Sequence, residues 1–164
     1  MAQSRFADID SSSAKKLAPI YGYFTQPLVS LEKSLEPLVP RIDQLTRFIK
    51  VAKQNCHFPN EHNLTKEESA AVYLYTMEWG EGSFYRVLNG ALRNEDRLAL
   101  KPWFSFLKLF DTAINKLPLV KRPLWRGVEQ DISVCFKKGL ELTWWSVNSC
   151  SLDVNVIKDF LGDN

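Results

Sequence analysis

Apolar residues recur at intervals of three and four positions through the first two thirds of the chain, a pattern that predicts helices. The amphipathic segment Leu28–Leu35 is stopped by Pro37 and Pro40. Pro40 can also begin the next helix, since the first helical position needs no backbone N–H donor. The apolar face of that helix comprises Ile42, Leu45, Phe48, Ile49 and Ala52. A polar loop over residues 55–63 follows it.

A capping box marks the start of the next predicted helix. The hydroxyl of Thr65 can accept a hydrogen bond from an otherwise unpaired amide, while the side chain of Glu68 reaches back to the helix start. The Gly-Glu-Gly sequence at 80–82 breaks this helix. A further helix over residues 83–93 is expected to bury one apolar face, made of Phe84, Val87, Leu88 and Ala91.

The pattern changes between the two halves of the chain. Pro102 lies in the first turn of one more predicted helix. Its continuous apolar stripe comprises Trp103, Phe106, Leu107, Phe110 and Ile114. Short extended segments are then expected over residues 124–128, 132–136 and 142–150, before a final helix over 152–161. Helices followed by strands predict an α+β domain.

Length and composition fit one globular domain with a sizeable core, since 45% of the 164 residues are hydrophobic. The polar start of the chain predicts a disordered leader over residues 1–13, followed by a single domain over residues 14–164. Within that domain, the helical part extends to about residue 121 and the β part begins at about residue 122.

Charge and hydropathy narrow the classes of function. The formal net charge is +2, from 21 basic and 19 acidic side chains, and no block of five basic residues occurs. This pattern argues against a surface that follows nucleic-acid phosphates. The chain has no signal-like apolar core near its start and no apolar stretch of transmembrane length. We therefore expect no transmembrane segment and a cytoplasmic location, with secretion as the alternative.

The cysteines and histidines do not predict a metal site. Cys56, Cys135 and Cys150 are widely spaced and match no zinc or redox motif, so reduced thiols are expected. His57 and His62 lie in a polar loop without a cysteine or carboxylate at ligand spacing, which favours solvated side chains.

Two pairs of residues have the chemistry of a ligand site. Tyr85 and Asn89 lie one helical turn apart and share a face, although a packed tyrosine and a hydrogen-bonded asparagine would explain the same spacing. Arg126 lies in a short apolar segment beside Gly127, which would let a phosphorylated ligand approach the backbone. The alternative is an arginine on the exposed face of a strand.

A hydroxyl cluster follows the two adjacent tryptophans at 144–145. Ser149 and Ser151 flank Cys150 at the end of the apolar run. Their hydroxyls could face a ligand, or they could satisfy local backbone groups. The tryptophans themselves fit core packing.

The order of these features resembles the arginine-specific mono-ADP-ribosyltransferases, a family of animal ectoenzymes and clostridial-type toxins with an Arg–Ser–Glu active site. The resemblance covers about residues 64–164. It rests on the blocks Tyr73-Leu74-Tyr75-Thr76, Phe84-Tyr85-Arg86-Val87-Leu88-Asn89, Leu92-Arg93, Leu117-Pro118, Trp125-Arg126-Gly127 and Ser149-Cys150-Ser151. It implies a helical N-terminal lobe against part of a split β-sandwich, with a cleft for NAD between them.

The resemblance also implies roles for individual residues. Arg126 would contact the NAD phosphates, and backbone groups of Gly127 would meet the nicotinamide amide. Ser149 would orient the catalytic glutamate. The implied NAD contacts are Tyr85, Asn89, Arg126, Gly127, Ser149, Ser151 and Phe160, the last of which would lie against nicotinamide. No metal is implied.

Two departures from the family pattern limit this prediction. Cys150 stands where the family has threonine, and no Glu-x-Glu pair follows Ser151. The second glutamate of that pair stabilises an oxocarbenium-like transition state. The upstream glutamates do not fit its place; they are Glu67, Glu68, Glu78, Glu81 and Glu141.

The predicted function is therefore NAD-dependent transfer of ADP-ribose to an arginine of an acceptor protein, with release of nicotinamide. This chain is expected to be an incomplete or inactive form that alone binds NAD weakly if at all and has negligible transferase activity. The alternative is a non-catalytic protein-interaction module or inactive paralogue built on the same lobe.

Overall fold

The computed structural model describes residues 17–126, 138–139 and 144–156. Contacts divide the chain into two compact units, one formed by Ala18–Leu119 and the other containing the described residues from Val120 onward. The predicted leader over residues 1–13 lies outside the described residues.

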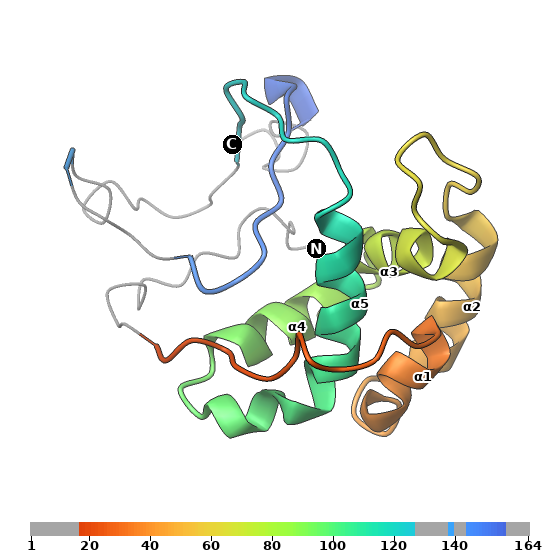
Figure 1. Cartoon of the computed structure of the whole chain (residues 1–164). Coiled ribbons are helices and arrows are strands. Elements are labelled where there is room, and N and C mark those ends of the chain that lie inside the picture. Colours follow the sequence, from red (N-terminus) through yellow and green to blue (C-terminus); the bar gives the residue numbers. More distant parts are fainter. Residues whose placement is uncertain (1–16, 127–137, 140–143, 157–164) are drawn as a thin grey trace. The chain divides into compact units, whose positions relative to one another are not determined.

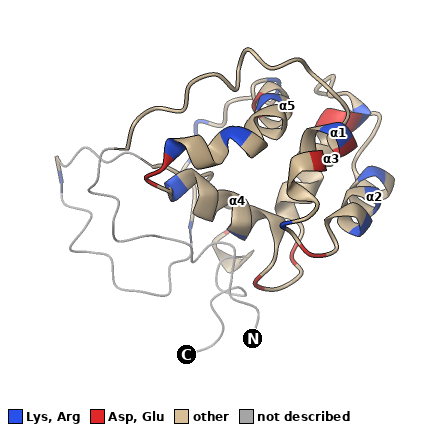
Figure 2. Cartoon of the chain, turned by 90° about the horizontal axis from the view of Figure 1, so that it is seen from below, with Lys and Arg blue, Asp and Glu red and all other residues tan. Residues whose placement is uncertain are grey.

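The unit Ala18–Leu119 is built from helices (Figure 1). Its elements are α1 (Leu31–Leu35), η2 (Glu36–Leu38), α2 (Leu45–Asn55), α3 (Lys66–Thr76), α4 (Phe84–Arg93), η3 (Arg97–Trp103) and α5 (Phe104–Ile114). Helix α3 packs against both α2 and α5, and α1 also packs against α5. Basic residues are spread over α2, α4 and α5 in the described part of the chain (Figure 2).

The capping box at the start of α3 is confirmed. Thr65 Oγ1 accepts a hydrogen bond of 3.2 Å from the backbone N–H of Glu68, and the backbone N–H of Thr65 donates one of 2.7 Å to Glu68 Oε2. These two bonds satisfy backbone N–H groups at the helix start, which have no carbonyl partner within the helix. The helix therefore begins where the sequence predicts.

The predicted start of α2 at Pro40 is wrong. Residues 39–44 form turns and a bend instead, and the backbone N–H groups of Arg41 and Ile42 both donate to the carbonyl of Leu38. Gln44 then adopts a left-handed conformation, with a φ of 54°, so a helix cannot run through it. Helix α2 begins at Leu45, after this break.

Aromatic rings fill the interior of the helical unit. The rings of Phe84 and Phe106 are fully buried and meet edge to face, with centroids 4.7 Å apart. Trp103 packs against Phe84, and Phe110 packs against Phe106. Edge-to-face pairs add a favourable quadrupole term to the burial of apolar area. These rings therefore join α4, η3 and α5 in the interior of the unit.

Two predicted apolar faces agree with the buried faces only in part. Helix α4 buries Phe84, Tyr85, Leu88, Asn89 and Leu92, whereas Val87 and Ala91 are only half-buried. On α5 the stripe is confirmed through Phe110, but Ile114 is 42% exposed. Leu109 and Ala113 are buried in its place.

The α+β prediction, including part of a β-sandwich, is contradicted. The described residues contain no strand, and the predicted extended segments meet only at an isolated antiparallel bridge between Trp125 and Ser151. The chain bends at Ser146, which interrupts the predicted segment 142–150. A single pair of short segments is too small to form a sheet by itself.

The predicted segment 132–136 lies outside the described residues. Of the predicted final helix over residues 152–161, the described part is helical only over residues 154–156. Among the helices of the described chain, none has the length and apolar character needed to cross a membrane.

Candidate functional site

The bridge between Trp125 and Ser151 brings together the two segments that carry Arg126 and the serine cluster. The backbone N–H of Trp125 donates to the carbonyl of Ser151 over 2.7 Å, and the N–H of Ser151 donates to the carbonyl of Trp125 over 2.8 Å. This reciprocal exchange is the hydrogen-bonded pair of an antiparallel ladder. In this register Arg126 stands opposite Cys150.

The guanidinium of Arg126 has two neighbours on the other segment. Its Nη1 donates a hydrogen bond to Oδ1 of Asn148. Its central carbon lies 5.3 Å from the ring centroid of Trp144, within the range of a cation–π interaction. Asn148 is held in turn, because its Nδ2 donates to the carbonyl of Ser146 over 3.0 Å. Arg126 is half-buried.

The two predicted serines differ in their surroundings. Ser151 Oγ accepts a hydrogen bond of 3.0 Å from the backbone N–H of Asp153, as the local-capping alternative expects. Ser149 is half-buried between Asn148 and Cys150. Side chains alternate along an extended segment, so Asn148, rather than Ser149, is the residue expected on the face of Arg126. The Asn148 contact agrees with that alternation.

Asn148 was not singled out from the sequence, although it lies in the same run as the serines. The missing information was the register, because only the Trp125–Ser151 pairing shows which residues stand diagonally across from Arg126. In the sequence, the signal for this role is the amide side chain of Asn148 itself, two positions before Cys150. Gly127 and Phe160 lie outside the described residues.

Tyr85 and Asn89 belong to the helical unit and share the buried face of α4. Their exposed fractions are 1% and 3%. The Tyr85 hydroxyl donates a hydrogen bond of 2.6 Å to Oε2 of Glu78, and Asn89 Nδ2 donates one of 3.3 Å to the hydroxyl of Tyr75. These contacts are those of the packing alternative. The NAD contacts implied by the resemblance stay predictions.

Glu78 connects the loop before α4 to the helix itself. Its Oε1 accepts hydrogen bonds from Ser83 Oγ at 2.5 Å and from the backbone N–H of Gly80 at 2.9 Å. Burial alone would raise the pKa of this carboxyl. The hydrogen bonds from Ser83, Tyr85 and Gly80, together with the nearby charge of Arg86, outweigh that effect and lower the pKa below its ordinary value.

Two other glutamates also stabilise the helical unit. Glu67 Oε2 accepts a hydrogen bond of 2.7 Å from the backbone N–H of Leu31, and its Oε1 pairs with Lys53 Nζ at 2.7 Å. Glu68 combines its capping role with an ion pair to Lys116 at 2.7 Å. Glu67, Glu68 and Glu78 are therefore engaged in structural contacts.

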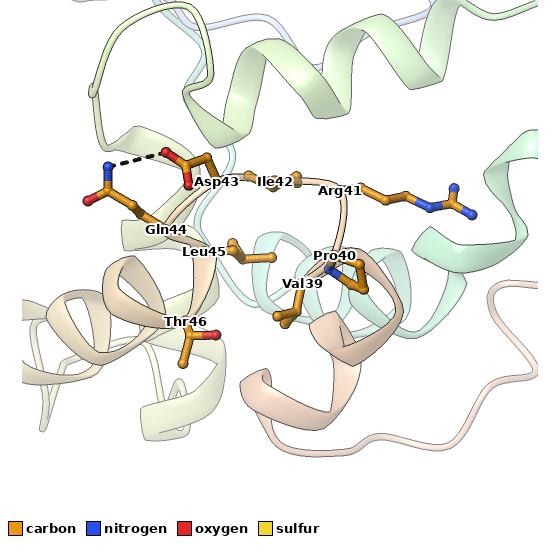
Figure 3. Close-up of a pocket in the computed structure, with 8 residues that line it drawn as sticks. All are labelled: Val39, Pro40, Arg41, Ile42, Asp43, Gln44, Leu45 and Thr46. Atoms are coloured by element: carbon orange, nitrogen blue, oxygen red, sulfur yellow. Dashed lines mark hydrogen bonds between the residues drawn. The ribbon is translucent and has the colours of Figure 1, made fainter.

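Two of the hollows on the described part of the helical unit contain no predicted site residue in their lining. One, of about 400 Å³, lies in the turn between η2 and α2 and is lined by residues 39–46 (Figure 3). The other, of about 310 Å³, lies between the loop of His57 and His62 and the face of α3 that carries Tyr73. Both histidines of this loop lie near Glu61: the Nε2 atom of His57 is 3.8 Å from Glu61 Oε2, and the Nε2 atom of His62 is 3.5 Å from Glu61 Oε1.

Within the described part of the chain, no group of three or more His, Cys, Asp or Glu side chains is arranged to hold a metal ion. Cys56 and Cys150 carry free thiols. Comparison of the chain with protein-family models, with curated proteins and with solved structures finds no match.

Proposed function

We propose that the protein binds NAD through Arg126, as an incomplete or inactive form of an enzyme that transfers ADP-ribose from NAD to an arginine of an acceptor protein. The observation that carries the proposal is the pairing of Trp125 with Ser151, which brings the segment of Arg126 beside the segment that carries Asn148 and the serines. These are the two motifs of the Arg–Ser–Glu signature that the sequence contains. The proposal therefore rests on this local arrangement and on the order of motifs.

The dinucleotide is the ligand that suits Arg126. A planar guanidinium presents paired N–H donors that match two phosphate oxygens, and it keeps its charge at every physiological pH. Its half-buried position beside Trp144 reduces competition from water for such a contact. The guanidinium of Arg126, beside the ring of Trp144, would thus recognise the pyrophosphate of the dinucleotide.

The reaction breaks the bond between nicotinamide and C1′ of the ribose, and nicotinamide leaves with the bonding electron pair. A guanidinium nitrogen of the acceptor arginine then bonds to C1′ and loses one proton. Positive charge develops on the ribose between these events, and a carboxylate stabilises it in enzymes of this chemistry. Arg126 contributes by holding the diphosphate, so that the ribose is presented in a fixed position.

The test is NAD binding by the purified chain, measured by saturation-transfer NMR, which detects weak ligands. Arg126→Lys should weaken binding about tenfold or more, because lysine keeps the charge but loses the planar fork. Arg122→Lys is the matched control, since Arg122 is an exposed arginine of the same unit. Unchanged affinity in Arg126→Lys, or no NAD signal with the unchanged chain, would contradict the proposal.

A second candidate function, a non-catalytic protein-interaction module, is favoured by the apolar surface of the same unit. Five large apolar side chains there are each about half exposed: Val120, Leu124, Trp125, Trp144 and Leu152. Exposed large apolar side chains are a common feature of protein contact surfaces. If the protein has this function, neither the unchanged chain nor Arg126→Lys should give an NAD signal in the NMR experiment. The same experiment therefore separates the two functions.

A further inference from the structure

We infer that Asn148 is a positioning residue for Arg126, which it holds in the orientation that a pyrophosphate requires. The inference rests on the proposed function for the identity of the ligand. It adds a residue that the Arg–Ser–Glu signature does not contain. The contact itself, between Asn148 Oδ1 and Arg126 Nη1, is independent of any ligand.

The orientation of the Asn148 amide is fixed from its other end. Nδ2 donates to the carbonyl of Ser146 over 3.0 Å, which leaves Oδ1 directed at the guanidinium. If the amide were flipped, an NH₂ group would face the arginine, and two donors would oppose each other. The backbone at the Ser146 bend therefore determines which atom Asn148 presents to Arg126.

Two contacts restrict the guanidinium in complementary ways. The Trp144 ring, 5.3 Å from the guanidinium carbon, favours positions over its face but permits rotation about the side-chain axis. The hydrogen bond to Asn148 ties one terminal nitrogen to a definite point. An arginine side chain has several rotatable bonds, and restricting them before binding removes an entropic cost that the ligand would otherwise bear.

The neutrality of Asn148 matters for this role. A carboxylate at this position would accept the same hydrogen bond more strongly, but it would also neutralise the charge that attracts a phosphate. An amide supplies the acceptor without that charge. Asn148→Asp and Asn148→Ala therefore separate the two properties of the side chain.

The experiment follows the guanidinium and the ligand separately in the full chain. The side-chain ¹⁵N signal of Arg126 is assigned by its loss in Arg126→Lys, and NAD affinity is measured by titration. Asn148→Ala should shift or broaden the Arg126 signal and weaken NAD binding about three- to tenfold. Asn148→Asp should keep a sharp Arg126 signal and still weaken NAD binding. Asn155→Ala, an exposed asparagine of the same unit, should change neither.

The outcomes distinguish the possible failures. An Arg126 signal that does not respond to Asn148→Ala would overturn the inference, whatever happens to NAD affinity. An Arg126 signal that responds equally to Asn155→Ala would also overturn it, because the effect would then be a general loss of structure. Absence of NAD binding by the unchanged chain would contradict the proposed function, while the Arg126 signal would still report on the Asn148 contact.

Discussion

The hydroxyl of Tyr85 donates a hydrogen bond of 2.6 Å to Oε2 of Glu78, and this bond ties the first turn of α4 to the loop before it. The other carboxylate oxygen of Glu78 accepts from Ser83 and from the backbone of Gly80. A short loop is thereby closed on itself around one acidic side chain. The buried ring of Tyr85 anchors that loop to the core.

Removing the Tyr85 hydroxyl should destabilise the helical unit. Tyr85→Phe keeps the buried ring and deletes one hydrogen bond to a carboxylate, so the free energy of unfolding should fall by about 1–2 kcal/mol. Urea unfolding monitored by circular dichroism measures this loss. Tyr21→Phe is the control, because Tyr21 is 72% exposed and the same change there should have little effect. Equal stability of Tyr85→Phe and the unchanged chain would contradict the anchoring role.

NAD affinity of the same variant separates the two roles considered for Tyr85. If the hydroxyl only anchors the loop, the folded Tyr85→Phe protein should bind NAD as the unchanged chain does. Weaker binding at a temperature where both proteins remain folded would instead support the cofactor contact that the family resemblance implies.

The contribution of Glu78 to stability should depend on pH. Its pKa is lower in the folded chain than in the unfolded chain, because the hydrogen bonds from Ser83 and Tyr85 outweigh the effect of burial. The stabilisation is therefore complete above the pKa that Glu78 has in the unfolded chain, about 4.3. It is lost as the pH falls through the lower pKa that Glu78 has in the folded chain. Glu78→Gln should be less stable than the unchanged chain at pH 7.

The measured quantity is the difference in unfolding free energy between these two proteins at a series of pH values. It should shrink as the solution is acidified through the range below the unfolded pKa. The Glu78 side chain is 34% exposed, so solvent screens part of the effect and the difference should be modest. A difference that stays constant from pH 7 to pH 3 would show that the carboxylate charge has no stabilising role.

Gly80 is required by the backbone of the same loop. Its φ of +96° is a conformation that residues with a side chain rarely adopt, although nothing lies within 4 Å of the position of an added Cβ. Gly80→Ala should therefore lower the free energy of unfolding by about 1–2 kcal/mol through strain alone. Gly82→Ala is the matched control.

At Gly82 an added Cβ would lie 3.8 Å from Trp79 Nε1, an ordinary van der Waals distance. Alanine there should be neutral or slightly stabilising, since it reduces the freedom of the unfolded chain. Thermal unfolding of the two single variants tests the contrast. If Gly82→Ala proved the more damaging change, the strain argument would be wrong.

The parts of the fold that the sequence predicts are those determined by local chemistry. Thr65 and Glu68 are three residues apart and form the capping box through their own backbone groups, so their pattern is sufficient. The start of α2 depends instead on the left-handed conformation of Gln44, which residue type does not reveal. Local propensity favoured Pro40 and could not detect that break.

The contacts of the candidate site depend on pairings that local patterns do not encode. The sequence identified Arg126 and the serine cluster as belonging together, but not the register that selects Asn148 as the neighbour of Arg126. The short apolar segments after Pro123 likewise predicted strands, whereas the strand-like pairing in the described residues from Val120 onward is limited to the Trp125–Ser151 bridge. A stable strand needs neighbouring segments that pair with its backbone along its whole length, and the sequence pattern does not show whether such segments are available.

The ion pair between Glu68 and Lys116 predicts an unequal cost for its two ends. Lys116 Nζ lies 2.7 and 2.8 Å from the two carboxylate oxygens and links the start of α3 to the turn that follows α5. The Glu68 side chain is 3% exposed, whereas that of Lys116 is 36% exposed. Burial opposes ionisation of Glu68, but the hydrogen bonds from Lys116 and Thr65 outweigh it and lower its pKa.

Lys116→Met should therefore cost more than Glu68→Gln. Without Lys116 the buried carboxylate loses its cation, and we expect a loss of about 2–4 kcal/mol. Without the carboxylate charge, Lys116 can still reach water, and a glutamine oxygen can still accept from the Thr65 amide, so about 1–2 kcal/mol is expected. Urea unfolding of both variants and of the double variant gives the coupling energy. If Glu68→Gln were the more costly change, burial of an unpaired carboxylate would not be what makes this pair matter.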